Sequence, residues 1–485
     1  MLLTLDTRAD LTLDIFRQVA WEGAAIRFSD GAMARMRAAR AAFMKLIEDP
    51  DLVIYGVTSG YGQNARLRLD GAARRTHART PPYPCTAPFG RPAPDRVARG
   101  IVLARLANFI DGHAAVTPEL AVEVADLLQG GRLPEVSLEG QGGAGEILWL
   151  GPLIIAVAER FPLAEKDALS LINGAPAASA LIADAAIAMR RRLDLAERVL
   201  ALSAEAILAP LEAYDPALEA LWDDAHEAVA LQRMRHLLEG GAPARRPYQA
   251  PVSYRILPRV LGQFRRVIAA AEEIAASSLR SVTDNPVFLP PDAGAPDPAH
   301  PFGRVLSNGG YHNARAYPAL DNLAAAAADL CAIAERHTTK LLDGRYSLLP
   351  DQLQSDSGQQ GYLGILGFVQ VGYAEQARRA AQRTFLPGSE GGGFGQNDVA
   401  PLTGLAWMAQ EEAGRCLEAA LAMLGAVASQ ALHVTARQAP PALADLLADI
   451  RAAFPPLDAP RRYGPGLAAL AEAFRADIYG AMPSA

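Results

Sequence analysis

The segment that most constrains this chain is 137–158, SLEGQGGAGEILWLGPLIIAVA, in which a glycine-dense loop runs directly into an apolar stretch of helical length. Glycine reaches positive φ without steric cost and lets backbone approach another group closely. At a helix N-terminus, such a loop is suited to binding an anion or to backbone chemistry. Gly140, Gly142 and Gly145 also satisfy the G-x-G-x-x-G pattern of dinucleotide-binding loops.

The dinucleotide alternative requires a strand before the loop, an acidic residue about 20 positions later and alternating strands and helices. Residues 133–138 are compatible with a short strand, and Glu159 or Glu165 lies near the acidic position. The rest of the chain, however, shows one helical pattern after another, without the strands that a doubly wound sheet needs. We therefore favour a mainly α fold over a nucleotide-binding sheet.

Composition supports helices and excludes some partners. Of the 485 residues, 51% are hydrophobic but only 6% are aromatic, so the apolar content is mainly Ala and Leu, which lose little on entering a helix. The net charge of −7 argues against nucleic acid as a partner. The three cysteines, Cys85, Cys331 and Cys416, are far apart and fit neither a disulfide framework nor a zinc site. We expect reduced thiols and no metal.

The sequence favours a cytoplasmic protein that does not enter a membrane. Asp6 and Asp10 stand where a signal peptide would have its basic and apolar regions. The longest apolar run, 147–158, is shorter than the roughly 20 residues that span a bilayer.

Hydrophobic periodicity and turn residues predict the elements along the chain. The Ala-rich segment 31–47 should be helical, 52–55 is β-prone, and the prolines of 79–95 exclude a regular helix. Helical periodicity returns over 95–129 and restarts at Thr117-Pro118. The further predictions are helices at 163–171, 176–208, 256–279, 317–342, 361–383 and 402–431, loops at 289–303 and 386–395, and short helices from 439.

Unusual polar clusters mark seven loops. They are 55–62 (YGVTSGYG), the glycine run 140–145, 171–174 (LING), 249–255 (QAPVSYR), 283–286 (TDNP), 307–312 (SNGGYH) and 395–398 (GQND). In order and spacing they resemble the histidine and aromatic amino acid ammonia-lyases and aminomutases. The family segments read YG[IV]NTGFG, ASGDLAPL, LINGT, QDPYSLR, TDNP, SGGNFH and NQED or HNQD. One such motif would be weak, but seven in order, spanning most of the chain, are specific.

The resemblance implies a mainly α fold built on a long central helix bundle of the fumarase and aspartase type, with the active site on loops. It implies one ammonia-lyase-like unit over 1–485, with a loop-rich part at about 1–200, the central bundle at about 201–435 and short helices at about 436–485. It also implies a homotetramer whose active sites take residues from several subunits.

The family's electrophile, methylidene-imidazolone (MIO), forms when an Ala-Ser-Gly triad cyclises and its serine is dehydrated. The corresponding positions here are Gly143, Ala144 and Gly145, and Ala144 has no hydroxyl to eliminate. The neighbouring residues also differ, with Glu146 in place of Asp and 147–149 reading ILW in place of LAP. We therefore expect no MIO and no other cofactor.

Other family positions have changed as well. The tyrosine of QDPYSLR is Val252, although Tyr254 stands nearby, the asparagine of GGNFH is Gly310, and Asn397 precedes the late Asp. Ordinary deamination is therefore not expected, and whether Tyr254 replaces the lost tyrosine stays open.

Several family positions keep residues that are suited to catalysis or substrate binding. By resemblance, Tyr55 matches the catalytic base, Arg255 the residue that clamps a substrate carboxylate, and His77 the position that contacts the substrate ring. A guanidinium fits a carboxylate bidentately, and asparagines supply hydrogen bonds without charge. The predicted catalytic residues are Tyr55 and Tyr254, and the predicted substrate-binding residues are His77, Asn173, Arg255, Asn285, Tyr311, Gln396 and Asn397.

Each of these has a purely structural alternative. Tyr55 has the pattern of a half-buried packing residue, and Arg255 that of an ion-pair partner. The Asn-Gly pair at 173–174 is typical of a helix end, and Asn-Pro at 285–286 of a turn. Residues 396–398 would then only shape a pocket, and His312 and His337 are interpreted as structural histidines.

MIO exists because a β-hydrogen beside a ring is barely acidic and an amine leaves poorly. Without it, a tyrosine base, with a reference pKa of about 10, must act on an already acidic proton or a good leaving group. The first hypothesis is an MIO-independent enzyme that catalyses elimination, addition or isomerisation on a carboxylate-bearing, aromatic or amino-acid-derived molecule. The second is a catalytically silent homologue that binds a small carboxylate or acts as a scaffold. An ordinary ammonia-lyase comes third.

Overall fold

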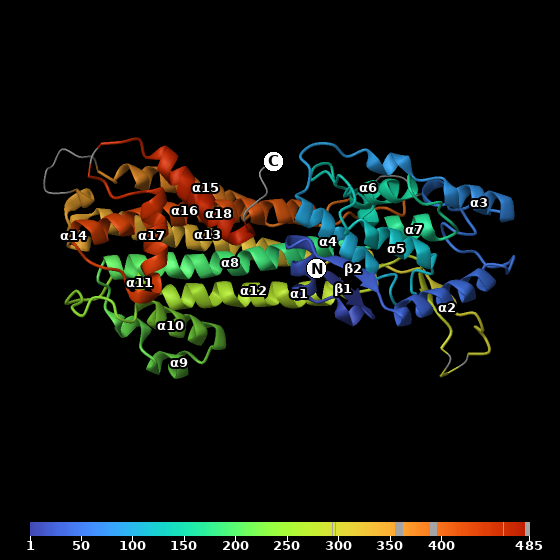
Figure 1. The fold of residues 1–485 in the computed structure, drawn as a ribbon, viewed down its shortest axis with the longest axis horizontal. Helices are drawn as coiled ribbons and strands as arrows, with labels where there is room; N and C mark the ends of the chain where they lie inside the picture. Colours follow the sequence, from blue (N-terminus) through green and yellow to red (C-terminus); the bar gives the residue numbers. More distant parts are fainter. Residues whose placement is uncertain (293, 296, 355–361, 389–394, 459, 481–485) are drawn as a thin grey trace. The chain divides into compact units, whose positions relative to one another are not determined.

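The computed structural model describes residues 1–292, 294–295, 297–354, 362–388, 395–458 and 460–480. Almost all of the regular structure in these residues is helical (Figure 1). The residues group into two compact units, and both are discontinuous in sequence. Unit 1 is Met1–Ala185, Ala271–Leu320 and Thr384–Met408, and unit 2 is Ala186–Ala270, Asp321–Arg383 and Ala409–Ala485. The predicted sequential division at about 200 and 435 does not coincide with these boundaries.

Unit 1 consists of short helices and two small sheets. Strands β1 and β2 pair in parallel from Leu2↔Ala25 to Leu5↔Phe28, and β3 and β4 pair antiparallel from Val287↔Leu306 to Leu289↔Arg304. The elements are β1 (Leu2–Leu5), α1 (Leu13–Phe16), β2 (Ala25–Phe28), α2 (Asp30–Leu46), α3 (Gly71–Arg79), α4 (Asp95–Leu106), α5 (Pro118–Asp126), α6 (Ile147–Ala158), α7 (Asp167–Ile172), β3 (Val287–Leu289) and β4 (Arg304–Leu306). A π-helical turn covers Arg17–Trp21, and 3-10 turns cover Arg8–Asp10, Gly62–Asn64, Tyr83–Thr86 and Ala144–Glu146.

Four long helices have residues in both units, and the remaining helices of unit 2 are shorter. The long ones are α8 (Pro176–Ala206), α12 (Leu257–Leu279), α13 (Ala316–Leu342) and α16 (Thr403–Val434). Unit 2 adds α9 (Ala217–Trp222), α10 (Ala225–Leu238), α11 (Val252–Arg255), α14 (Gly344–Ser347), α15 (Ile365–Ala380), α17 (Ala444–Ala453) and α18 (Gly464–Tyr479). Its 3-10 turns are Leu211–Tyr214, Asp351–Leu353 and Pro441–Leu443.

The long helices are core helices. The alanines of α8 are almost completely buried, because a methyl side chain lets neighbouring backbones pack closely at little entropic cost. By length and apolar composition, residues 167–206 and 403–434 could cross a membrane, but their most apolar windows are 89% and 83% buried inside the structure. This burial is what an interior helix shows when it is apolar on all sides.

The long helical predictions are confirmed, but two strand interpretations are wrong. Residues 52–54 are irregular and lead into a tight turn at 55–58, in which the Ile54 carbonyl accepts from the amides of Val57, Thr58 and Ser59. Residues 133–138 contain no strand, and Ser137 only bridges Pro92. Helix α15 is shorter than predicted, residue 361 lies outside the described residues, and residues 389–394 of the predicted loop 386–395 do so as well.

A small hydrophobic core in unit 1 connects the elements that carry the predicted site. Phe43 of α2, Ile54, Leu169 of α7 and Phe288 of β3 are all buried in it, and Tyr55 packs against it. The rings of Phe43 and Phe288 meet edge to face, with centroids 5.3 Å apart. This core holds the loop 55–62 against α7 and brings residues 283–288 to the same place.

Candidate active site

Helix α7 is the element on which the predicted site is assembled. It begins after Lys166, which has a left-handed backbone with φ 75°, and it ends at Asn173. The loop 55–62 packs on α7 at Gly56, whose φ is +70° and whose Cβ, if it had one, would lie 2.9 Å from Leu169 Cδ2. Only glycine fits this position, since it combines a positive φ with a close approach.

Tyr55 is half-buried and retains an accessible side. Its hydroxyl oxygen accepts a hydrogen bond from the backbone N–H of Gly62 at 3.0 Å. This bond fixes the position of the Tyr55 hydroxyl within the loop. The loop therefore gives Tyr55 one of the features that a tyrosine base needs.

Two aromatic rings and a thiol surround this loop. The rings of Tyr61 and His77, which is carried by α3, lie 4.8 Å apart between centroids. Burial raises the pKa of the Tyr61 phenol, and nearby Cys85 and Tyr55 add to this effect. Burial lowers the pKa of His77, although the backbone of Gly56 opposes the shift. His77 is therefore a neutral imidazole at neutral pH, and its Nε2 has no hydrogen-bond partner within the described residues.

The glycine loop is open at Gly142 and Gly143 and closely packed at Gly145. Gly143 and Gly145 have φ of 82° and 72°. A Cβ on Gly142 or Gly143 would meet no heavy atom within 4 Å. On Gly145, a Cβ would lie 3.1 Å from Asn173 Oδ1 and 3.6 Å from Tyr311 Cδ2. The structure thus places Asn173 and Tyr311 beside Gly145, the last residue of the degenerate MIO triad.

The two predicted asparagines are hydrogen-bonded to each other. Asn173 Nδ2 donates to the carbonyl of Asn285 at 2.8 Å, so its Oδ1 is left to face Gly145. Asn285 Oδ1 accepts from the backbone N–H of Asn308 at 2.9 Å, and the Asn285–Pro286 peptide is cis. Both asparagines are half-buried, so the site can present a fixed amide oxygen to a ligand.

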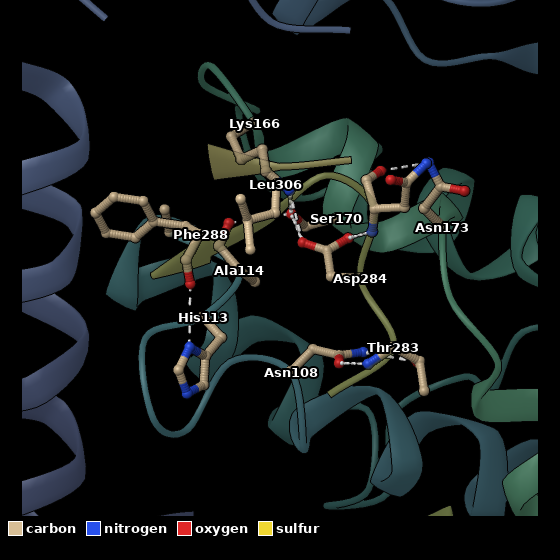
Figure 2. Close-up of polar contacts among 12 residues, drawn as sticks. Asn108, His113, Ala114, Lys166, Ser170, Asn173, Thr283, Asp284, Phe288 and Leu306 are labelled. Carbon is tan, nitrogen blue, oxygen red and sulfur yellow. Dashed lines mark hydrogen bonds and ion pairs between the residues drawn. The ribbon is translucent and has the colours of Figure 1, made fainter. Parts of the chain in front are cut away.

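A buried ion pair, which the sequence analysis did not single out, lies next to these asparagines (Figure 2). Lys166 Nζ is 2.6 Å from Asp284 Oδ2 and donates to Ser170 Oγ at 2.8 Å. Ser170 Oγ lies 3.0 Å from Asp284 Oδ2 and 3.1 Å from the Ala114 carbonyl oxygen. Burial lowers the pKa of Lys166, although Asp284 opposes that shift. Two features of the sequence could have indicated this ion pair. They are the i, i+4 spacing of Lys166 and Ser170 and the position of Asp284 directly before Asn285.

Glu146 connects the glycine loop to α8. Its carboxylate accepts from the backbone N–H groups of Ala177 at 2.7 Å and Ala178 at 2.9 Å, two donors in the first turn of that helix. Burial raises the pKa of Glu146 to about 8, although the two amides and Arg105 favour its charged form. The contact joins residues 31 positions apart or more, so local sequence gave no signal of it.

The structure places the other predicted residues elsewhere. Tyr254 and Arg255 belong to unit 2. Tyr254 is fully buried, its ring stacks on His337 with centroids 3.6 Å apart, and its hydroxyl donates to the His337 carbonyl at 3.2 Å. This burial leaves its phenol no open side. Arg255 is half-buried, and its Nε donates to the Ala250 carbonyl at 3.0 Å.

Gln396 is exposed and Asn397 half-buried at the start of the segment 395–408. Among the described residues, no group of three or more His, Cys, Asp or Glu side chains could hold a metal ion. Unit 1 therefore brings together six predicted residues on or beside α7. The six are Tyr55, His77, Gly145, Asn173, Asn285 and Tyr311. The other unit contains Tyr254 and Arg255.

The seven loop motifs and this arrangement agree with the comparison to known families. The model of the family described as "Aromatic amino acid lyase" matches residues 11–158 and 153–452. The chain belongs to the aromatic amino acid lyase family. Among its relatives, histidine ammonia-lyase from Streptomyces coelicolor is 31% identical over 395 residues, 75% of each chain. The enzyme of that name from Symbiobacterium thermophilum is 28% identical over 495 residues, 96% of this chain and 95% of that one.

Solved structures of other lyases share the fold. The ergothioneine-degrading enzyme ergothionase from Treponema denticola superposes with a TM-score of 0.89 at 18% identity, covering 99% of this chain and 100% of that one. Histidine ammonia-lyase from Trypanosoma cruzi superposes with a TM-score of 0.85 at 22% identity, covering 99% and 94%. These likenesses confirm the predicted mainly α, ammonia-lyase-type fold of this aromatic amino acid lyase homologue.

Proposed function

We propose that this lyase homologue is an MIO-independent enzyme that catalyses elimination, addition or isomerisation on a carboxylate-bearing, aromatic or amino-acid-derived small molecule, with Tyr55 as the base. The observation that carries the proposal is the methyl side chain of Ala144, at the position where the family has a serine. Dehydration of a serine hydroxyl creates the alkene of MIO, and an alanine has nothing to eliminate. The triad Gly143-Ala144-Gly145 does not fit the group, so no step of the reaction is assigned to it.

The missing electrophile narrows the substrate class. An unactivated amine leaves poorly, whereas a quaternary ammonium leaves as a neutral tertiary amine and needs no covalent activation. Ergothioneine, on which the structurally similar Treponema denticola enzyme acts, is an amino-acid betaine with such a group. We therefore propose betaines of aromatic amino acids as the first substrates to test. The open space beside Gly142 and Gly143 is consistent with a bulky leaving group.

The elimination needs only groups of this chain. The Tyr55 phenolate removes a proton from the β-carbon, and the C–H electrons become the Cα=Cβ bond. The tertiary amine departs with the electrons of the C–N bond, so charge and atoms balance. The N–H of Gly62 donates to the Tyr55 oxygen and holds it in place, and Asn173 Oδ1 is available to accept a hydrogen bond from the substrate. Arg255 is proposed to hold the carboxylate, contributed by another subunit of a cytoplasmic homotetramer.

The test measures turnover of ergothioneine, L-histidine and aromatic amino acids. Product formation is monitored by the absorbance of the arylacrylate and by assay of the released amine. The betaine should react and the primary amines should not. Replacing Tyr55 with Phe removes the base and should lower kcat by about 10²-fold or more. Arg255→Ala should mainly raise KM, since it removes an orienting contact. Unchanged turnover by Tyr55→Phe would refute the base.

Two further measurements separate the alternatives. The intact mass should equal the mass of the sequence, whereas loss of water at 143–145 would refute the absence of MIO. A thermal-shift screen with amino acids, arylacrylates and aryl hydroxy acids detects binding, and mass analysis of the hits detects conversion. Binding without conversion would favour the silent, carboxylate-binding homologue.

A further inference from the structure

The last turn of helix α4 and the turn that follows it carry two polar side chains that hold the loops of the candidate site. Arg105 lies in the last turn of α4, and Asn108 follows three residues later. Both are almost completely buried. The Arg105 guanidinium donates through Nη1 to the backbone carbonyl of Asn173, and Asn108 Oδ1 accepts from the backbone N–H of Thr283 at 2.7 Å. One helix end therefore contacts the loop of each predicted asparagine (Figure 2 shows Asn108 and Thr283).

The contact of Arg105 depends on the local sequence. Asn173 is the C-cap of α7, where the last carbonyls have no partner within the helix. Arg105 supplies that partner. Gly174, with φ +120°, makes the approach possible, because a Cβ there would lie 2.8 Å from Thr283 Oγ1 and 3.0 Å from Arg105 Nη2. The Asn-Gly pair is thus required for a specific contact as well as for ending the helix.

The two loops are also connected to each other. Thr283 Oγ1 accepts from the N–H of Ala175 at 3.0 Å, and Asn173 Nδ2 donates to the Asn285 carbonyl at 2.8 Å. A displacement of either loop therefore moves the amide oxygen that faces Gly145. Since both loops are anchored on α4, the position of that oxygen depends on Arg105 and Asn108.

The charge of Arg105 is accommodated where it lies. Its guanidinium carbon is 5.6 Å from the centroid of the Phe109 ring, and its charge interacts favourably with Asp284 and Glu146. Burial lowers the pKa of Arg105 to about 10, which still leaves it charged at neutral pH. Its Nε and Nη2 have no hydrogen-bond partner within the described residues. The guanidinium therefore makes its hydrogen bond to the Asn173 carbonyl through Nη1.

We propose that Arg105 and Asn108 are positioning residues of the candidate site, which set the place of the Asn173 amide relative to Gly145. This inference rests on the proposed function, because it assigns the two residues a role in turnover. Neither side chain would touch the substrate, so their effect is expected on the geometry of reaction rather than on binding.

The chain offers a matched control on the same helix. Arg99 of α4 is half-buried and likewise donates to backbone carbonyls, of Val19 at 2.7 Å and of Ala24 at 2.9 Å, away from the site loops. Arg105→Lys and Arg99→Lys each remove a guanidinium that ties α4 to a loop. A merely structural role for Arg105 predicts similar behaviour of the two variants.

The test compares steady-state kinetics of the full-length wild type, Arg105→Lys, Asn108→Ala and Arg99→Lys on the substrate found by the turnover screen. Misplacing a reacting group by about 1 Å can cost 10²-fold, so Arg105→Lys and Asn108→Ala should lose about 10²-fold in kcat with KM within about threefold. Arg99→Lys should keep its kcat even if it melts earlier. Equal losses in kcat for Arg105→Lys and Arg99→Lys would overturn the inference.

Crystal structures of the variants keep the inference testable if the wild type turns nothing over. The Asn173–Asn285 hydrogen bond should be broken or displaced in Arg105→Lys and Asn108→Ala and retained in Arg99→Lys. An unchanged bond in the first two variants would refute the positioning role without bearing on the reaction. Asn108→Ala, which leaves every charge in place, serves if Arg105→Lys does not fold.

Discussion

At the scale of single residues, the ammonium of Lys166 and the carboxylate of Asp284 form a buried ion pair near the candidate site. Both side chains are fully buried, and their charges lie 2.6 Å apart. Removing two charges from water is costly, and their attraction repays that cost only when geometry and further hydrogen bonds are good. Ser170 supplies such a bond, so the pair is stable as a unit and vulnerable when either member is removed.

Replacing Lys166 with Met should therefore leave Asp284 buried and unpaired and destabilise the protein by about 3–5 kcal/mol. Urea denaturation, followed by circular dichroism, measures the loss. In the double variant Lys166→Met/Asp284→Leu, part of the stability should return, because no unpaired charge remains.

The control for this pair is Arg378→Met, which breaks the exposed pair between Arg378 and Glu375. Exposed ion pairs contribute about 0–1 kcal/mol, so this variant should unfold close to the wild type. If Lys166→Met were no more destabilised than Arg378→Met, the buried pair would not anchor α7 to the loop 283–286.

At the scale of elements, the N-terminus of α8 depends on a residue from a distant loop. The helix starts at Pro176, which has no N–H, and the next two amides donate to Glu146. Both carboxyl oxygens of Glu146 thus accept hydrogen bonds from this helix end. The side chain that follows the triad 143–145 therefore caps the long helix that follows Asn173.

The burial of Glu146 predicts a pH dependence of stability. Its pKa in the folded protein is about 8, above the value of 4.5 expected for an exposed Glu, so the folded state binds a proton that the unfolded state has lost between these values. The contribution of this bound proton to the free energy of unfolding is fully present below pH 4.5 and is lost as pH rises to 8. Over this range the free energy of unfolding falls by at most about 1.4 kcal/mol per pH unit. Glu146→Gln should remove this slope.

The measurement is urea denaturation of wild type and Glu146→Gln at pH values from 5 to 9. The difference between the two proteins isolates Glu146 from other buried carboxyl groups, such as Asp167, whose pKa is also raised by burial. Parallel curves over the whole range would contradict a raised pKa for Glu146.

Elements differ in how far sequence could predict them. The helices that became α2, α8, α12, α13 and α16 were predictable, because Ala and Leu at helical spacing favour helix both locally and in the core. The β-prone segment 52–55 forms no strand, because Thr58 Oγ1 accepts from the Ile54 amide at 2.7 Å and donates to the Leu52 carbonyl at 2.9 Å. Strands of three or four residues, such as β3 and β4, carry too little pattern to be recognised.

At the scale of the whole molecule, motif order predicted some of the residues that the structure places on or beside α7, but not the residues that support them. Tyr55, Asn173 and Asn285 were predictable because each stands in a family-like motif. Lys166, Glu146 and Arg105 were not, because their partners lie between 31 and 118 residues away in sequence and are set by tertiary packing. Tyr254, chosen for its sequence proximity to a lost tyrosine, is a buried ring stacked on His337.

The proposed homotetramer makes a prediction at this scale, because Tyr55 lies in unit 1 and Arg255 in unit 2. If each active site combines Tyr55 of one subunit with Arg255 of another, two impaired variants should complement each other when they are assayed at substrate well below the raised KM of Arg255→Ala. Tyr55→Phe and Arg255→Ala, unfolded, mixed in equal amounts and refolded together, would give intact pairs at about a quarter of the sites. Activity should therefore reappear in the mixture and not in either variant refolded alone.

The matched control is a mixture of Tyr55→Phe with Asn173→Ala. Both residues lie at α7 within unit 1 of the same subunit. Every site therefore takes both residues from one subunit and carries either the Tyr55 or the Asn173 substitution. That mixture should stay inactive. Recovery in the first mixture alone would show that Arg255 acts across a subunit boundary, because random assembly changes only which subunits meet. No recovery in the first mixture, from tetramers that native mass spectrometry shows to contain both variants, would contradict a site shared between Tyr55 of one subunit and Arg255 of another.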